Sequence, residues 1–166
     1  MNEPEHRPDT RQRWAFVGKY GHYYLWGGAL KTTYRYYWDD WGVKAHTLEI
    51  GYDHRLTEDW LVSPVVRLYT QTAATFWGNT FPVPQTYMSS DYRLAAFSSI
   101  LGGLGVTYRY SPDLDLNIGF TLQSQSGKDG ITLSQAATSR TPAGSTTVSA
   151  ADLSVWTVTL GFSWRY

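Results

Sequence analysis

The sequence predicts an all-β protein: an antiparallel up-and-down meander of about seven strands that forms a transmembrane β-barrel or part of one. Three observations lead to this fold class. Polar and apolar residues alternate with a period of two, the alternation keeps one parity along the chain, and aromatic residues gather near the expected strand ends. No segment shows a sustained helical period of 3.6 residues.

Even-numbered residues form the apolar side of each expected strand, and odd-numbered residues form the polar side. Ile118 and Phe120, for example, alternate with Asn117 and Gly119. A period of two places the two sets on opposite faces of a sheet. The expected strands are 12–26, 29–38, 45–56, 60–77, 92–110, 114–126 and 151–166.

The connections between these strands alternate in length. Three short ones, LWGGAL, LTEDW and YSPDL, carry turn residues in their middle. The longer ones are 39–44, 78–90 and 127–150, and the last is rich in Ser, Thr, Gly and Ala. Short turns at one end of a sheet and long loops at the other are typical of outer-membrane barrels.

Length and composition narrow the possible classes. The 166 residues are enough for one domain with a polar N-terminal segment, 1–11, followed by a barrel domain, 12–166. Balanced charge, with 14 basic and 14 acidic residues, argues against a nucleic-acid partner. The absence of cysteine excludes disulfides and thiolate metal sites. No apolar run is long enough for a membrane-spanning helix.

The aromatic residues favour lipid rather than a protein core against the apolar face. They make up 16% of the chain, and they lie near strand ends, where the headgroup zones of a membrane would fall. Side chains of this size on every strand would also overfill a small barrel if they pointed inward. The expected interfacial aromatics are Trp14, Trp26, Trp38, Trp60, Phe76, Tyr92, Tyr108, Tyr110, Trp164 and Tyr166.

The polar face is rich in Gly, Ser and Thr and carries many arginines, whose fixed fork of donors suits ion pairs in a confined lumen. Arg35, Glu49 and Arg67 are expected to form a cross-strand network. This network suits either a lumen lined for anionic solutes or a salt-bridged plug. The expected lumen-facing polar residues are Lys19, Arg35, Glu49, Asp53, Arg67, Arg93, Arg109, Asp115 and Arg165, with Arg13 and Arg55 on the same face.

Several motifs resemble a family of bacterial outer-membrane proteins known only as a domain of unknown function. They are YRYYWDDWGVKAHTLEIGYDHRL (34–56), PVVRLYTQTAATFW (64–77), SSDYRLAAF (89–97) and the arginine-rich RPDTRQRWAFVGKYGHYY. The resemblance covers about residues 7–110 and weakens thereafter. It implies the fold and a bacterial outer-membrane location, and little about activity.

The resemblance also implies that the chain corresponds to the C-terminal half of longer relatives. Strand counting points the same way, because an antiparallel barrel of seven strands would bring two parallel strands together, and bacterial barrels have even counts. We therefore expect an incomplete sheet that is open, irregularly closed, or completed by another chain or by missing N-terminal strands. The final strand, which alternates strictly and ends on Tyr166, resembles those recognised by the barrel-assembly machinery.

Enzymatic and metal sites are weaker hypotheses. Ser63, Asp53 and either His46 or His54 could form a hydrolase triad, but parity places both histidines opposite Ser63. The two histidines are also too far apart to share a metal ion. The acidic pair Asp39–Asp40 could bind Ca²⁺, although a turn stabilised by the aspartates explains it better.

The sequence therefore predicts a passive outer-membrane pore or scaffold with an arginine-rich polar lumen, in contact with outer-membrane lipid. No cofactor, metal or catalytic residue is expected. A soluble small-ligand-binding β-barrel, with its aromatic residues inside, is the alternative. An outer-membrane lipid hydrolase is the third hypothesis.

Overall fold

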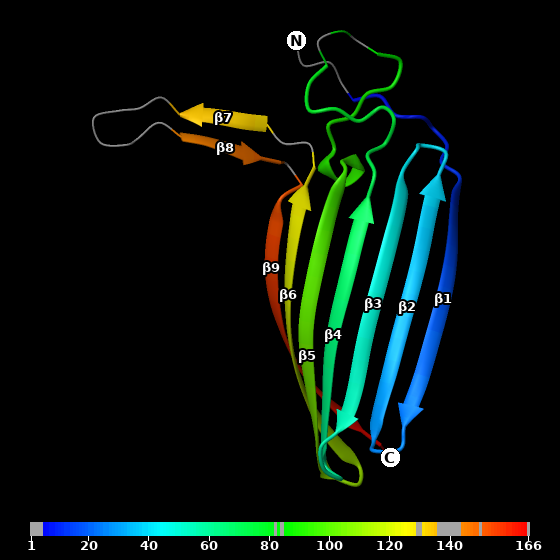
Figure 1. Ribbon diagram of the computed structural model, residues 1–166, viewed down its shortest axis with the longest axis vertical. Coiled ribbons are helices and arrows are strands. Elements are labelled where there is room, and N and C mark those ends of the chain that lie inside the picture. Colours follow the sequence, from blue (N-terminus) through cyan, green and yellow to red (C-terminus); the bar gives the residue numbers. More distant parts are fainter. Residues whose placement is uncertain are drawn as a thin grey trace, which may run out of the picture.

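A single antiparallel sheet dominates the computed structural model, which describes residues 5–81, 83, 85–128, 131–135, 144–149 and 151–165. Seven strands of the described chain pair in the order β1-β2-β3-β4-β5-β6-β9 (Figure 1). This confirms the predicted all-β meander. The strands are β1 (Arg13–Tyr24), β2 (Gly28–Asp39), β3 (Lys44–Arg55), β4 (Trp60–Gln71), β5 (Phe97–Ser111), β6 (Leu114–Gly127) and β9 (Leu153–Trp164).

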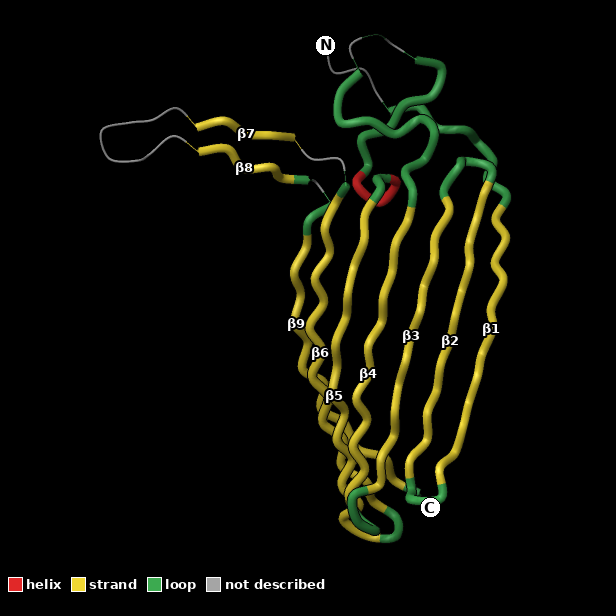
Figure 2. The backbone as a smooth tube through the Cα atoms, viewed as in Figure 1, coloured by secondary structure: helices red, strands yellow, loops and turns green. Residues whose placement is uncertain are grey.

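The sheet is open, as the strand count suggested. Every neighbouring pair is antiparallel, so β1 and β9 run in the same direction at the two edges. Within the described part of the chain, neither edge strand pairs with a second strand. The strands curl into a trough rather than a flat sheet (Figure 2).

The two faces of the trough differ in exposure as well as in chemistry. On β6, the apolar side chains of Leu116, Ile118 and Phe120 are about half exposed, at 43%, 52% and 48%. The residues that alternate with them, Asn117, Gly119 and Thr121, are less exposed. The even-numbered apolar face is therefore the convex outer face, and the odd-numbered polar face is the concave one. In a water-soluble protein, a sheet buries its apolar face against the core and exposes its polar face, which is the opposite arrangement.

Turns and loops are sorted to opposite ends of the trough. Three short turns, 25–27, 56–59 and 112–113, lie at one end, which we call the turn end (Figure 1). The connections 40–43 and 72–96 and the link from β6 to β9 lie at the other, which we call the loop end.

The link after β6 contains a feature that the sequence did not predict. β7 (Ile131–Gln135) and β8 (Gly144–Val148) pair with each other as a separate two-stranded hairpin. Both strands are polar apart from a few aliphatic residues, so they lack the sustained apolar alternation from which the other strands were predicted.

The expected strands 60–77 and 92–110 were too long. β4 ends at Gln71 and β5 begins only at Phe97. The side chain of Asp91 accepts a hydrogen bond from the backbone N–H of Arg93 at 3.0 Å and caps a 3-10 turn, η1 (Tyr92–Leu94). The apolar periodicity continues past the strand ends because these residues pack into a loop core instead.

That loop core holds most of the buried apolar side chains. Of the buried apolar residues in the described chain, only Ala45 belongs to a strand of the sheet. Val43, Ala74, Phe76 and Leu94 form the central cluster. Phe76 and Tyr92, which were predicted as interfacial aromatics at strand ends, both lie in the 72–96 loop. The prediction for Phe76 was wrong, because its side chain is buried in the loop core, whereas Tyr92 is exposed. Tyr37, Trp41 and Trp77 pack against the cluster.

No helix in the described residues is long and apolar enough to span a membrane.

Candidate functional site

An arginine-rich cavity of about 460 Å³ lies at the loop end of the concave face. Side chains from the N-terminal segment, from β1 to β4 and from the 72–96 loop meet there. We call it the arginine cavity. Within the described chain, five arginines line it: Arg7, Arg11, Arg13, Arg35 and Arg93.

Backbone and side-chain contacts hold the N-terminal segment across the loop end. His6 pairs with Met88 in an isolated antiparallel bridge. The indole N–H of Trp41 donates to the carbonyl of Thr10 at 2.9 Å, and the backbone N–H of Gln12 donates to Asp40 Oδ1 at 3.0 Å. These contacts place Arg7 and Arg11, which lie in a segment without strand periodicity, beside the arginines of the sheet.

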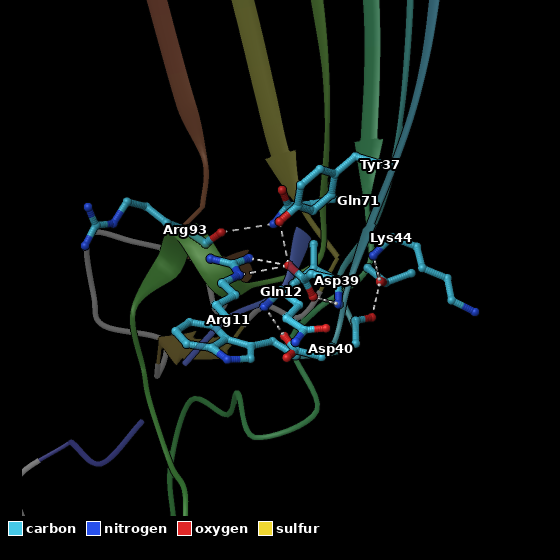
Figure 3. Close-up of polar contacts among 12 residues, drawn as sticks. Arg11, Gln12, Tyr37, Asp39, Asp40, Lys44, Gln71 and Arg93 are labelled. Carbon is cyan, nitrogen blue, oxygen red and sulfur yellow. Dashed lines mark hydrogen bonds and ion pairs between the residues drawn. The ribbon is translucent and has the colours of Figure 1, made fainter. Parts of the chain in front are cut away.

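A buried carboxylate fixes the wall of the cavity (Figure 3). The Asp39 side chain is fully buried. Arg11 donates to Asp39 Oδ2 from Nε and Nη2, at 2.9 and 2.6 Å, and the Tyr37 hydroxyl donates to the same oxygen at 2.7 Å. The other oxygen accepts from the backbone N–H of Val43 at 2.9 Å. Arg11 also lies over the Trp41 ring, 4.3 Å from its centre.

Gln71 ties the 72–96 loop to the same wall. Its side-chain amide donates to the carbonyls of Arg93 and Ala95, at 3.1 and 2.7 Å. Its carbonyl oxygen accepts from the hydroxyl of Tyr69 at 2.6 Å. Gln71 is buried, and both ends of its side-chain amide are hydrogen-bonded. These bonds fix the position of the 72–96 loop relative to β4.

Asp91 gathers two of the loop-end arginines. Arg93 donates to both of its carboxylate oxygens, with the shortest distance 2.7 Å, and Arg7 lies 3.2 Å away. The hydrogen bonds from the Arg93 side chain lower the pKa of Asp91 to about 2, against the opposing effect of burial. Arg7 also pairs with Glu5 and, through that hydrogen bond, lowers the pKa of Glu5.

We expect acid to loosen the loop end. The folded pKa of Asp91 lies below its unfolded value of about 3.9, so the ionised carboxylate stabilises the fold above about pH 4 and this stabilisation disappears as the pH falls through 2. Glu5 acts in the same direction. Pepsin cleavage within 72–96 should therefore rise between pH 4 and pH 2. Asp91→Asn should be cleaved readily already at pH 4 and change less below it.

The control for this prediction is Asp113→Asn, which removes a carboxylate from the turn end and should keep the acid response of the unaltered protein. An unchanged acid response in Asp91→Asn would contradict the role of Asp91.

Two arginines of the cavity lack a carboxylate partner. Within the described chain, no carboxylate lies within ion-pair distance of Arg13 or Arg35. The guanidinium of Arg35 lies over the Tyr37 ring, 5.5 Å from its centre. Three described carboxylates pair with the other three arginines, so two of the five arginines in the cavity have no ion-pair partner in the described chain. The three carboxylates are Glu5, Asp39 and Asp91.

The middle of the concave face carries paired charges. Arg67 Nε donates to Glu49 Oε2 at 2.7 Å, between residues that face each other directly on β3 and β4. Arg35, which was expected to join them, instead faces Thr47 and lies over an aromatic ring. Lys31 pairs with Asp53, and Lys19 lies exposed on the edge strand β1.

A second charged group lies at the turn end. Asp115 pairs with Arg165 and lies 3.7 Å from Arg109 Nε, which finds no hydrogen-bond partner there. A smaller cavity of about 190 Å³ opens beside them. Of the nine predicted lumen-facing residues, Arg93 lies in η1 rather than in a strand, and its side chain is mostly exposed, although it lines the arginine cavity.

The remaining predicted aromatics gather at the two ends of the convex face. Trp14 and Trp38 face each other across β1 and β2 near the loop end, with ring centres 6.1 Å apart. At the turn end, the rings of Trp60 and Tyr108 lie tilted against each other with centres 4.7 Å apart, and Trp26 donates from its indole N–H to the Tyr52 hydroxyl at 3.0 Å. Trp164 ends β9 at the turn end and Tyr110 lies at an irregularity of β5, while Tyr166 lies outside the described residues.

The structure does not assemble the hypothetical hydrolase triad. Asp53 pairs with Lys31 on the concave face, and Ser63 lies on the neighbouring strand β4. His54 stacks on Tyr52, and His46 bonds the hydroxyl of Tyr34 at 2.8 Å, both on the convex face.

The acidic pair Asp39–Asp40 forms a turn, as expected. Asp39 accepts from the backbone of Val43, and Asp40 accepts from the backbone of Gln12. No group of three or more His, Asp or Glu side chains in the described chain is arranged to hold a metal ion.

Sequence reasoning missed the contributions of Arg7 and Arg11 to a site. They lie in a segment that was expected only to be polar, and nothing in a local pattern shows that it folds back over the sheet. The available signal was the arginine-rich lead-in RPDTRQR, which stands beside the first strand.

Comparisons with known proteins identify a family for this chain. A family model described as "Protein of unknown function (DUF3570)" matches residues 1–155. No curated protein and no solved structure matches the chain.

Proposed function

The chain belongs to the DUF3570 family of unknown function, and from that premise we propose that its sheet is part of the wall of a bacterial outer-membrane β-barrel. The apolar convex face contacts outer-membrane lipid, and the concave face lines a polar interior. The role is passive, as a pore or as a scaffold, and it requires no catalytic residue.

The inverted sheet is the observation that carries this proposal. Large apolar side chains along the strands are the more exposed set, while Gly, Ser, Thr and paired charges occupy the sheltered concave face. In water, an exposed apolar surface that runs along whole strands is unfavourable and marks an interaction surface. Lipid is the partner that fits an apolar band running across all seven strands.

The height of the apolar band also fits a membrane. On β1, Trp14 and Tyr24 mark its two ends and lie ten residues apart. At a rise of roughly 3.3 Å per residue this is about 33 Å along the strand. A tilt of 35–45° shortens it to about 25 Å, the height of the apolar band in such barrels.

To close this barrel, the strand that pairs with β1 and the strand that pairs with β9 must run in the same direction. An antiparallel partner for β1 and an antiparallel partner for β9 both run opposite to these edge strands. A complementary set that begins and ends in that direction contains an odd number of strands, which restores an even total. A second copy inserted the same way would present edges of the wrong direction. The complement is therefore a different set of strands, on a longer chain or on another protein.

The edge strand β9 suits recognition by the barrel-assembly machinery. All of its described residues are exposed, and Trp156, Val158, Leu160 and Phe162 alternate along it on the convex face. An unpaired edge in lipid would be costly, since its backbone groups would find no water. We expect the machinery to cover this edge until the complementary strands pair with it.

Cysteine labelling tests which solvent meets each face. The chain contains no cysteine, so single variants report without background. In intact membranes, a charged and membrane-impermeant thiol reagent should leave Phe120→Cys unmodified and react with Thr121→Cys, its neighbour on the concave face. Both should react after denaturation.

Rapid reaction of Phe120→Cys in intact membranes would contradict the proposal, because a side chain about half exposed to water reacts at once. If Phe120→Cys is protected and Thr121→Cys is also unreactive, the interior is filled, and the protein is a scaffold rather than a pore.

A further inference from the structure

We propose that the arginine cavity is a binding site for a phosphate monoester, which Arg13 and Arg35 hold through their guanidinium groups. This inference goes beyond the proposed function, because the cavity is built from the chain's own loop end and does not depend on which solvent meets the convex face.

The pairing of the other arginines singles out these two. Arg11 is committed to a buried carboxylate by two hydrogen bonds, and Arg7 and Arg93 converge on Asp91. Arg13 and Arg35 make no such pair with any described carboxylate. Each therefore offers its full fork of N–H donors, the geometry that matches two oxygens of a phosphate.

The register of the sheet directs both side chains at the same space. Arg13 faces Asp39 across β1 and β2, and Arg35 faces Val17, so the two positions lie four residues apart along the sheet, roughly 14 Å. Tyr37 lies between them on the same face. Both arginines line one cavity, and two long side chains that converge from its ends leave space between them for a ligand.

Charge and size favour a phosphate monoester. Two guanidinium groups without ion-pair partners match the charge of a phosphate ester, about −1.5 to −2 at neutral pH, better than the single charge of a carboxylate. At about 460 Å³ the cavity lies within the range of small-molecule sites, with space for an organic group beside the phosphate. The aromatic rings of Tyr37, Trp41 and Tyr69 form walls for that group.

The phosphate could belong to a free metabolite or to a lipid headgroup, and the experiment separates these sources. Purified full-length chain in nonionic detergent is titrated by calorimetry with inorganic phosphate, glycerol 3-phosphate and acetate. In a parallel measurement, the chain is mixed with phosphatidylcholine vesicles that contain or lack phosphatidic acid. Binding of glycerol 3-phosphate identifies a free ester as ligand, and selective binding to phosphatidic acid vesicles alone identifies a headgroup.

In whichever measurement shows binding, Arg13→Gln and Arg35→Gln should each weaken it at least about tenfold, because each removes charge-assisted hydrogen bonds. Both residues are exposed and unpaired with carboxylates, so neither change disturbs the fold. The matched control is Arg55→Gln, which removes one charge from the turn end of the same face and should leave binding unchanged.

Three results would overturn the inference: no binding of any phosphate probe, acetate binding as tight as that of glycerol 3-phosphate, or equal loss in Arg55→Gln and Arg35→Gln. None of them bears on the cysteine labelling of Phe120→Cys, so a failure here is distinguishable from failure of the membrane proposal.

Discussion

Ile118→Arg should destabilise the folded protein in lipid by about 2–4 kcal/mol, the cost of a cation on the lipid face near the bilayer midplane. Ile118 lies midway along the apolar band of β6, between Val106 on β5 and Leu160 on β9, with 52% of its surface exposed. In water the same change would replace one exposed side chain by another and cost within about 0.5 kcal/mol. Urea unfolding in phosphatidylcholine vesicles, followed by tryptophan fluorescence, measures the difference.

The matched control is Ser124→Arg, on the same strand and the same face but six residues nearer the loop end. Near the interface an arginine costs only about 0–1 kcal/mol. The lipid proposal therefore requires that the same introduced cation cost more at the deeper position, Ile118, than near the interface, at Ser124. Equal and small effects at both positions would mean that the convex face meets water.

The alternation of residues was sufficient to predict the sheet, because each strand is in contact with two different environments along its whole length. A period of two is then imposed at every position, as from Leu114 to Gly127 on β6. The same signal misled at the loop end. Phe76 and Leu94 continue the even parity, but they pack against Val43 in a loop core rather than in the sheet.

The arginine cavity could not be predicted in the same way. Its strand residues, Arg13 and Arg35, were placed on the correct face by parity, yet their separation from any carboxylate depends on register. Arg35 lies opposite Thr47 rather than Glu49, a shift of one pair along the face. Its loop residues come from segments whose position is decided by long-range contacts such as that between Gln71 and Ala95.

The loop end thus combines two kinds of arginine, those that build the wall and those that stay available. The difference lies in burial. The carboxylate that Arg11 holds has no access to water, so it must be satisfied within the protein. Arg13 and Arg35, by contrast, remain exposed, so their charges are solvated until a ligand arrives. The first kind should matter for stability and the second for binding.

Asp39→Asn should therefore destabilise the loop end by about 3 kcal/mol, since breaking a buried ion pair leaves an uncompensated charge. In either orientation the new amide points its NH2 group at a donor, either at Arg11 and Tyr37 or at the backbone N–H of Val43. We expect the N-terminal segment to detach first, seen as faster hydrogen exchange at Gln12.

The neighbouring Asp40→Asn is the control, because its side-chain carbonyl can still accept from the Gln12 backbone, and we expect a change within about 0.5 kcal/mol. If the two variants were equally stable, the buried carboxylate would not be what holds the segment in place. If Asp39→Asn loosened the segment and Arg35→Gln did not, the division between wall-building and available arginines would hold. The first change leaves the mostly buried guanidinium of Arg11 without its ion pair, and the second removes an exposed cation that pairs with no described carboxylate.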